Sequence, residues 1–295
     1  MTAIPSSAEA GGESAAAQPS SNGAGPSADS GEPMRLGGMA MRNGLLVHGP
    51  TSWAAAARNS KTGDIDVASG PKPNFGGNLV AKVPLLRGPV RMAEAFAVIP
   101  IARKALPSAR LPFEDPRVLL AAGGVTLANN VLRGKGGSAA TPGREAAAAV
   151  LGMLPAMVAL SGTELAAYHG VEHKAIAAYE QGSRDPSIAA KEHDRCGSNL
   201  IAPMMIFTVA GQAILQRLPN RPGHVAQATV SVASLSLAVE TFVYAERNPD
   251  SPVGRAVHAG GNSIQRLFAT REPNDEQIEV GVAAMDAILE AEGAA

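Results

Sequence analysis

The chain has 295 residues, of which 45% are hydrophobic, 17% are charged and 3% are aromatic, and its formal net charge is -1. Average soluble domains carry about 25% charged residues, so the apolar residues are expected to be concentrated in one part of this chain. The balanced charge excludes the basic surplus of a nucleic-acid-binding protein. The single cysteine, Cys196, excludes an intrachain disulfide.

Residues 1–33 contain no Lys, no Arg and no aromatic residue, and are rich in Ser, Gly, Ala, Pro and Glu. Such a composition cannot offset the entropy of ordering, so we predict a disordered tail. The tail also lacks the basic start and the apolar stretch of a secretory signal, which predicts an N-terminus that stays in the cytoplasm.

Residues 34–83 form short segments punctuated by glycine, which predict a small β-rich region, a β-hairpin cap with a turn at Lys61–Asp64. The stretch Arg87–Leu106 has the apolar spacing of an amphipathic helix, which Pro100 is expected to kink or divide. This helix either packs on the domain or lies on a membrane surface.

Residues 84–270 contain four apolar stretches and are interpreted as a helical membrane domain; the stretches are Val118–Leu132, Ala146–Leu160, Leu200–Leu215 and Val225–Ala245. A spanning helix needs about 20 predominantly apolar residues, so only the fourth stretch is long enough without help. Asn129 and Asn130 weaken the first stretch, which leaves between two and four spans. The competing interpretation is a soluble bundle of Ala-rich helices.

The placement of basic residues favours the membrane interpretation. If all four stretches cross with the N-terminus inside, most Lys and Arg fall on the inner side, as the positive-inside rule expects. The inner residues are Arg87, Arg91, Arg103, Lys104, Arg110, Arg117, Lys174, Arg184, Lys191, Arg195, Arg247 and Arg255, against Arg133, Lys135, Arg144, Arg217 and Arg221 outside. We therefore predict a multi-pass protein of the inner cell membrane, in contact with bilayer lipid.

A chemical motif lies between the second and third apolar stretches, within residues 163–199. On a helix, His169 and His173 are four residues apart and Glu172 is three from His169, so all three share one face. This is the H-x-x-E-H order of inverted zinc hydrolases, in which two imidazoles hold the ion and the carboxylate activates a water. The alternative is a pair of surface histidines beside a glutamate.

A second pair, His193 and Cys196, lies three residues apart, and an αα-hairpin broken near Gly182 and Pro186 would bring it beside the first. Further metal ligands are predicted among His193, Cys196 and Glu240, because Glu180 lies about 10 Å along the helix axis from His173. These donors suit a divalent metal, with zinc favoured. If one further residue joins the two histidines, a position stays open for water, which favours an enzyme. If both His193 and Cys196 bind the ion, four protein ligands fill the tetrahedron and the site is structural.

At these residues the chain resembles the YqhQ family of bacterial membrane proteins, described as predicted metal-dependent enzymes. Residues 168–180 read YHGVEHKAIAAYE against a family pattern like YHGAEHKAINAYE. The segment 193–197 is similar to the family's H-P-R-C-G, Glu240 falls at its Tyr-Glu pair, and 270–277 is similar to its T-R-E-P-D-D-E-Q. The resemblance implies a membrane location and a metal. Asn43 and His48 depart from the family pattern, replacing a carboxylate and a guanidinium, which puts specificity rather than metal binding in doubt.

The segment 271–295 begins with acidic residues and continues with helical apolar spacing, so it is interpreted as a cytoplasmic amphipathic helix that packs on the domain or on a partner. The whole chain is thus predicted to be mainly α, a multi-pass membrane protein, with a protein partner or homo-oligomer allowed. Its leading function is a metal-dependent hydrolase at the cytoplasmic membrane face with Glu172 as catalytic base. The alternatives are a non-enzymatic assembly factor and, less favoured, a transporter using Glu240.

Overall fold

The structure is a computed structural model that describes residues 33–294 apart from 78, 79, 81, 134–140, 162–163 and 219–222. The predicted tail, residues 1–33, lies outside the described residues except for Pro33. The strands are β1 (Gly37–Met41), β2 (Gly44–His48), β3 (Ser52–Arg58) and β4 (Ile65–Pro71). The α-helices are α2 (Arg87–Ala105), α3 (Pro116–Arg133), α4 (Pro142–Gly152), α5 (Leu154–Leu160), α6 (Glu164–Glu180), α7 (Ile201–Leu215), α8 (His224–Arg247), α9 (Pro252–Ile264) and α10 (Asp275–Ala291).

The four strands form one antiparallel sheet in the order β1-β2-β3-β4. The predicted hairpin at Lys61–Asp64 is confirmed, since Arg58 pairs with Ile65 across it and Gly63 has a φ of 83°. The sheet is larger than the predicted cap. Because β2 and β3 carry unbroken apolar runs that are buried on both faces, the sheet is a central layer of the fold.

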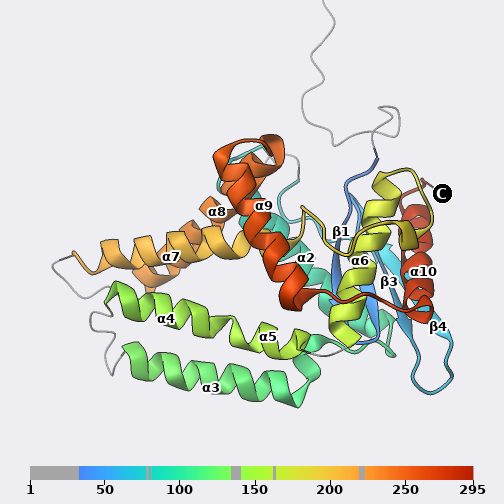
Figure 1. Ribbon diagram of the computed structural model, residues 1–295, viewed down its shortest axis with the longest axis horizontal. Coiled ribbons are helices and arrows are strands. Elements are labelled where there is room, and N and C mark those ends of the chain that lie inside the picture. The colour runs from blue at the N-terminus through green and yellow to red at the C-terminus, as the bar shows by residue number, and fades with distance from the viewer. Residues whose placement is uncertain are drawn as a thin grey trace, which may run out of the picture.

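Helices cover both faces of the sheet (Figure 1). Successive side chains of a strand point to opposite faces, so Leu45 and Val47 face α6 and α10, whereas Leu46 and Trp53 face α2. The predicted C-terminal helix is α10, which begins at a capping box between Asn274 and Gln277 and packs on the sheet and on α6. The predicted helix after residue 86 is α2, and it runs through Pro100 without a break.

The remaining helices extend away from this layered body, as Figure 1 shows for α3, α4, α5 and α7. Three helical segments are long and apolar enough to cross a membrane: Gly143–Leu160, Gly197–Leu215 and Val225–Arg247. At 1.5 Å per residue they are about 27, 28 and 34 Å long, close to the ~30 Å hydrocarbon core of a bilayer. The first of the four predicted stretches, now α3, is not among them.

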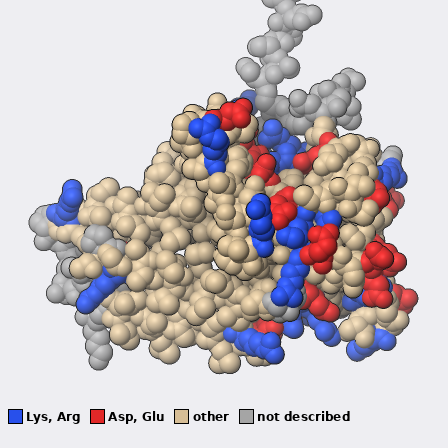
Figure 2. All heavy atoms as spheres, in the orientation of Figure 1, with Lys and Arg blue, Asp and Glu red and all other residues tan. Residues whose placement is uncertain are grey.

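The surface of these helices is apolar. No more than 22% of any of the three segments is buried by the rest of the protein, and side chains such as Leu120 and Val232 are more than half exposed. Lys, Arg, Asp and Glu gather over the sheet, α6 and α10 and leave most of the extended helices uncharged (Figure 2). An exposed apolar surface of this extent marks an interaction site, and these helices indicate association with a membrane.

Candidate metal centre

Helix α6 carries the H-x-x-E-H motif through the most enclosed part of the molecule. Most of its residues are buried, including the polar residues Glu172, His173 and Lys174. Tight backbone approaches make this possible: a Cβ on Gly170 would come within 2.3 Å of the Arg271 carbonyl oxygen. Because so little water reaches this helix, its polar groups must find partners inside the protein.

The two motif histidines are oriented by backbone carbonyls. His169 donates its Nδ1–H to the Ala269 oxygen at 2.9 Å, and His173 donates its Nδ1–H to the Lys191 oxygen at 2.7 Å. A carbonyl can only accept, so Nδ1 of each ring carries a proton, and the neutral form of each imidazole has its lone pair on Nε2. Histidines that bind metals through Nε2 are commonly fixed in this way.

Cys196 completes a group of three potential ligands. Its Sγ lies 3.5 Å from His169 Nε2, and ligand atoms of His169, His173 and Cys196 all lie within 4.8 Å of one another. The ring centroids of the two histidines are 4.3 Å apart. His173 Nε2 is buried and has no hydrogen-bond partner. A buried acceptor without a partner is costly, and a metal ion would satisfy it, so these residues fit a divalent cation.

The pKa values of the two motif histidines shift in opposite directions. Burial acts to lower the pKa of His169, but the hydrogen bond to Cys196 and the charge of Glu172 raise it to about 9. Burial and the neighbouring charge of His169 lower the pKa of His173 to about 2. His173 is therefore neutral at physiological pH, with its Nε2 lone pair available.

A π-helix after α9 supplies the support for this group. It spans Gln265–Ala269, and π-helical turns are frequent at functional sites. Ala269 at its end accepts the hydrogen bond from His169. Gln265 at its start is fully buried, accepts from the His193 backbone N–H at 2.7 Å and donates to Ser198 Oγ at 3.0 Å. One turn thus holds both the motif helix and the segment that carries Cys196.

The predicted base, Glu172, lies beside the group. One carboxylate oxygen is 3.8 Å from His169 Nε2, and the side chain packs against β1, where a Cβ on Gly38 would come within 2.6 Å of Glu172 Cγ. Burial raises the pKa of Glu172, although the positive charge on His169 opposes this. A carboxyl group with a raised pKa is suited to exchanging protons near neutral pH.

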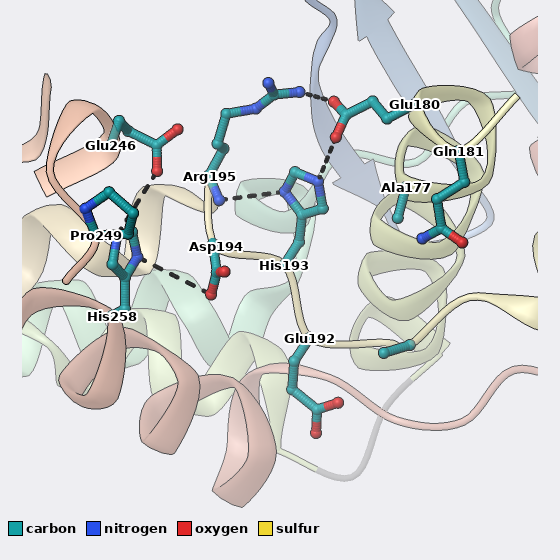
Figure 3. Close-up of a pocket in the computed structure, with 11 residues that line it drawn as sticks. Ala177, Glu180, Gln181, Glu192, His193, Asp194, Arg195, Glu246, Pro249 and His258 are labelled. Carbon is teal, nitrogen blue, oxygen red and sulfur yellow. Dashed lines mark hydrogen bonds and ion pairs between the residues drawn. The ribbon is translucent and has the colours of Figure 1, made fainter. Parts of the chain in front are cut away.

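The structure does not place His193 among the ligand atoms. The Arg195 backbone N–H donates to His193 Nδ1 at 3.2 Å, so the proton of the neutral ring is on Nε2, which lies 3.3 Å from Glu180 (Figure 3). Burial lowers the pKa of His193 and keeps the ring neutral. Both ring nitrogens are committed to these partners, and Glu180 also pairs with Arg195.

The structure also places Glu240 outside the group of His169, His173 and Cys196. It binds the Arg87 guanidinium and accepts from the Leu85 backbone N–H at 3.1 Å. Leu85 has a φ of 68°, a strained conformation for a residue with a side chain. Glu240 therefore fastens the start of α2 to α8.

The second arm of the predicted αα-hairpin is not a helix. Residues 185–200 form a loop with two short 3-10 turns, Pro186–Ile188 and Gly197–Leu200. Lys174 stabilises this loop by donating a hydrogen bond from its Nζ to the Ala189 carbonyl oxygen at 2.8 Å. The segment with His193 and Cys196 does approach the H-x-x-E-H motif, as expected, but as a loop. This loop brings Cys196 to the motif histidines and leaves His193 outside the group of ligand atoms.

The sequence did not predict the residues that orient the two histidines. Ala269 and Lys191 act through carbonyl oxygens, which every residue possesses, so their identity carries no signal. The π-helix has no sequence pattern that distinguishes it from an α-helix. Only the T-R-E-P resemblance next to Gln265 pointed to this part of the chain.

A cavity of about 470 Å³ lies near the group, although none of His169, Glu172, His173 and Cys196 lines it. His193 lines it, and the His193 ring centroid is 5.8 Å from that of His173. Other lining residues include Glu180, Asp194, Arg195, Glu246 and His258 (Figure 3). The candidate metal centre therefore has a polar space beside it that is large enough for a small molecule or a head group.

Comparison with known proteins finds one matching family and one similar bacterial protein. Residues 160–291 match the family described as "Protein of unknown function (DUF1385)". Over 133 residues, 42% of this chain, it is 29% identical to "Uncharacterized protein YqhQ" of Bacillus subtilis (strain 168), and the match covers 40% of that protein. No solved structure matches the chain. The family match contains His169, Glu172, His173 and Cys196, in agreement with the resemblance found in the sequence.

Proposed function

We propose that this member of the YqhQ family is a metal-dependent hydrolase of the cytoplasmic membrane face. His169, His173 and Cys196 would hold a divalent cation, for which zinc is the best match to two imidazoles and one sulfur. The observation that carries the proposal is the convergence of these three ligand atoms around the unpartnered, buried Nε2 of His173.

The number of ligands supports an enzyme rather than a scaffold. Among the described residues the group has three members, and structural zinc sites almost always have four protein ligands. His193, the residue that would close the site, is held by Arg195 and Glu180 instead. A substrate would approach the group from the nearby cavity on the side of His193, whose ring centroid is 5.8 Å from that of His173.

The chemistry follows from the residues. A divalent cation with an open position lowers the pKa of bound water towards ~7 and so supplies a nucleophile at neutral pH. Glu172, buried within 3.8 Å of His169, would take a proton from that water and return it to the leaving group. The backbone carbonyls of Ala269 and Lys191 keep both imidazoles in the required tautomer.

The location of the group supports action at a membrane surface. Cys196 directly precedes the apolar segment Gly197–Leu215, and Arg247 ends the segment Val225–Arg247. Cys196 therefore lies at the end of one helix that can cross a membrane, and the nearby cavity, which Glu246 lines, lies at the end of a second. If the first apolar stretch also crosses, as the sequence interpretation assumes, the excess of Lys and Arg would put this end in the cytoplasm.

Metal analysis of the purified protein tests the proposal. We expect about one equivalent of divalent metal in the wild type and a loss of about tenfold or more in affinity in His173→Ala, His169→Ala and Cys196→Ala, as each removes one of three ligands. Glu240→Gln is the matched control and should retain the metal, because Glu240 binds Arg87. A wild-type protein purified under metal-replete conditions without metal would refute the proposal.

Glu172→Gln separates catalysis from a structural role. The amide cannot accept the proton, so we expect metal content to be unchanged while complementation of a deletion strain is lost by 100-fold or more, on the order of general-base contributions. Full complementation by Glu172→Gln, with helix-breaking changes in α6 still inactive, would instead favour the non-enzymatic assembly factor.

A further inference from the structure

The polar cavity beside the metal centre lies at a boundary along the chain. Asp194 and Arg195 line it just before the apolar segment that starts at Gly197, and Glu246 lines it just before Arg247, where another apolar segment ends. Part of its lining therefore lies at the ends of two candidate membrane-spanning helices. A head group of a bilayer lipid occupies this depth.

The cavity carries an excess of negative charge. Its lining includes four carboxylates and one guanidinium, that of Arg195. Glu180 is paired with Arg195, and Glu192 with Lys191. In the described part of the chain, no Lys or Arg forms an ion pair with Asp194 or Glu246; both lie about 4 Å from His258.

His258 points between these two carboxylates in Figure 3. Its Nδ1 is buried and lacks a hydrogen-bond partner, and it lies 3.9 Å from Asp194 Oδ1. The opposite nitrogen, Nε2, lies 4.0 Å from Glu246 Oε1. These distances exceed those of direct hydrogen bonds. Asp194 Oδ1 accepts a hydrogen bond from Asn262 Nδ2 at 2.9 Å, so Asp194 Oδ2 and the Glu246 carboxylate retain acceptor capacity. A cationic group with several N–H donors, such as a primary ammonium, matches this arrangement.

A second, apolar cavity of about 340 Å³ lies between α7, α8 and α9. Ile206 and Phe207 line it about 14 Å beyond Gly197, and Thr241 lines it about 9 Å before Arg247, at 1.5 Å per residue. It therefore lies deeper along the same two apolar helices than the polar cavity does. Lipid chains extend in this direction from their head groups.

Helix α9 connects the two cavities. Val253, Ala256 and Val257 line the apolar cavity from one side of the helix, and His258 lines the polar cavity from another. The two linings also approach each other along the chain at the corner between α8 and α9, where Pro249 lines the polar cavity and Pro252 the apolar one. A single amphiphilic molecule that spans this corner would occupy both spaces.

We infer that the substrate is a membrane lipid with a primary ammonium in its head group, bound with the head group in the polar cavity and an acyl chain in the apolar cavity. The inference rests on the proposed function for the identity of the reacting centre. Its own evidence is the two neighbouring cavities, the carboxylates of Asp194 and Glu246, which form no ion pair with a Lys or Arg in the described part of the chain, and their position at the ends of two apolar segments.

Binding to the detergent-solubilised full chain tests the inference. Phosphatidylethanolamine and phosphatidylglycerol with the same short chains are titrated separately, together with phosphoethanolamine as a head group without chains. We expect phosphatidylethanolamine to bind about tenfold more tightly than phosphatidylglycerol, as for one charge-assisted hydrogen-bonded contact. Phosphoethanolamine should bind more weakly than the whole lipid.

Variants assign the two parts of the lipid to the two cavities. Glu246→Gln should remove the preference for phosphatidylethanolamine, whereas Asp250→Asn, a nearby exposed carboxylate outside the cavity, should keep it. Ala256→Trp fills the apolar cavity and should weaken both lipids about equally, whereas Ala259→Trp, exposed on the same helix but outside that cavity, should weaken neither.

His173→Ala keeps this test independent of the metal. This variant should lose the metal and keep the lipid preference. If the wild type itself holds no metal but the lipid preference and its dependence on Glu246 remain, the proposed reaction fails and the lipid site stands. Equal binding of the two lipids would overturn the inference, as would binding of phosphoethanolamine as tight as that of the whole lipid. An effect of Ala256→Trp no greater than that of Ala259→Trp would also overturn it, because the apolar cavity would then hold no chain.

Discussion

The layered body and the extended helices use the same apolar residue types in opposite ways. In the body, Leu45, Ile288 and Val171 are buried by the sheet, α6 and α10. In α3 and α8, Leu120 and Val232 are exposed. Folding of this chain removes the first set from water, whereas only an outside partner removes the second. The difference indicates that the body buries its own apolar side chains, whereas the extended helices have the exposed apolar surface of helices that associate with a membrane.

The candidate metal centre lies where these two regions meet. His169 and His173 come from a helix of the body, while Cys196 immediately precedes an apolar segment. Buried polar groups cost free energy in either environment unless they are paired, and the junction is where the chain supplies backbone carbonyls from both regions. A site in this position can reach a substrate held in the membrane without entering the membrane.

The sharpest test of the comparison shortens one apolar side chain in each region. Ile288→Ala opens a cavity in a fully buried site and should lower the free energy of unfolding by about 2–5 kcal/mol. Leu120→Ala, at a side chain that is 77% exposed, should change it by less than about 0.5 kcal/mol. Denaturant titration in detergent, followed by fluorescence of Trp53 for the body and by circular dichroism for the helices, measures both. Equal losses of unfolding free energy in the two variants would contradict the difference between the body and the extended helices.

The second test places a charge on each exposed surface. Val232→Arg lies about a third of the way along the segment Val225–Arg247, where Arg should cost up to about 2.5–3.5 kcal/mol of insertion free energy, the value at a helix centre. Ile188→Arg, at a similarly exposed position on the loop against the body, should cost almost nothing. The fraction of protein resistant to carbonate extraction of membranes reports the difference. If Val232→Arg resists extraction as well as Ile188→Arg, α8 does not span the membrane.

The third test uses pH to perturb the body alone. Burial, together with the charge of Lys72, lowers the pKa of His48 from 6.5 to about 4. The unfolded chain therefore binds this proton more readily, so the contribution to stability is complete above pH 6.5 and is lost as the pH falls towards 4. The loss should reach up to about 3 kcal/mol at acidic pH.

Trp53, which pairs with His48 across the sheet, reports this unfolding by its fluorescence. His48→Asn should reduce the loss of stability between pH 6.5 and 4, and the circular dichroism of the apolar helices should follow the change less closely than the fluorescence does. An unchanged pH dependence in His48→Asn would show that other groups of the body control its acid stability.

The sequence predicted the elements whose pattern is local. The helical spacing of 164–180 placed His169, Glu172 and His173 on one face, and the apolar runs of 200–215 and 225–245 predicted two of the helices that can span a membrane. The run of alanines in β3 was less informative, because a strand buried on both faces has no alternation. The size of the sheet, and its place at the centre of the body, therefore became visible only in the structure.

The composition and spacing of the sequence by themselves determined a mainly helical chain with apolar segments and a polar motif between them. Tertiary structure alone decided which residues join that motif. Cys196 reaches His169 because a loop and a π-helix fold back over α6, while Arg87 and Glu180 hold Glu240 and His193 elsewhere. The physical reason is that helical spacing fixes neighbours within a few residues, whereas distant residues meet through packing and backbone hydrogen bonds, which no residue pattern records.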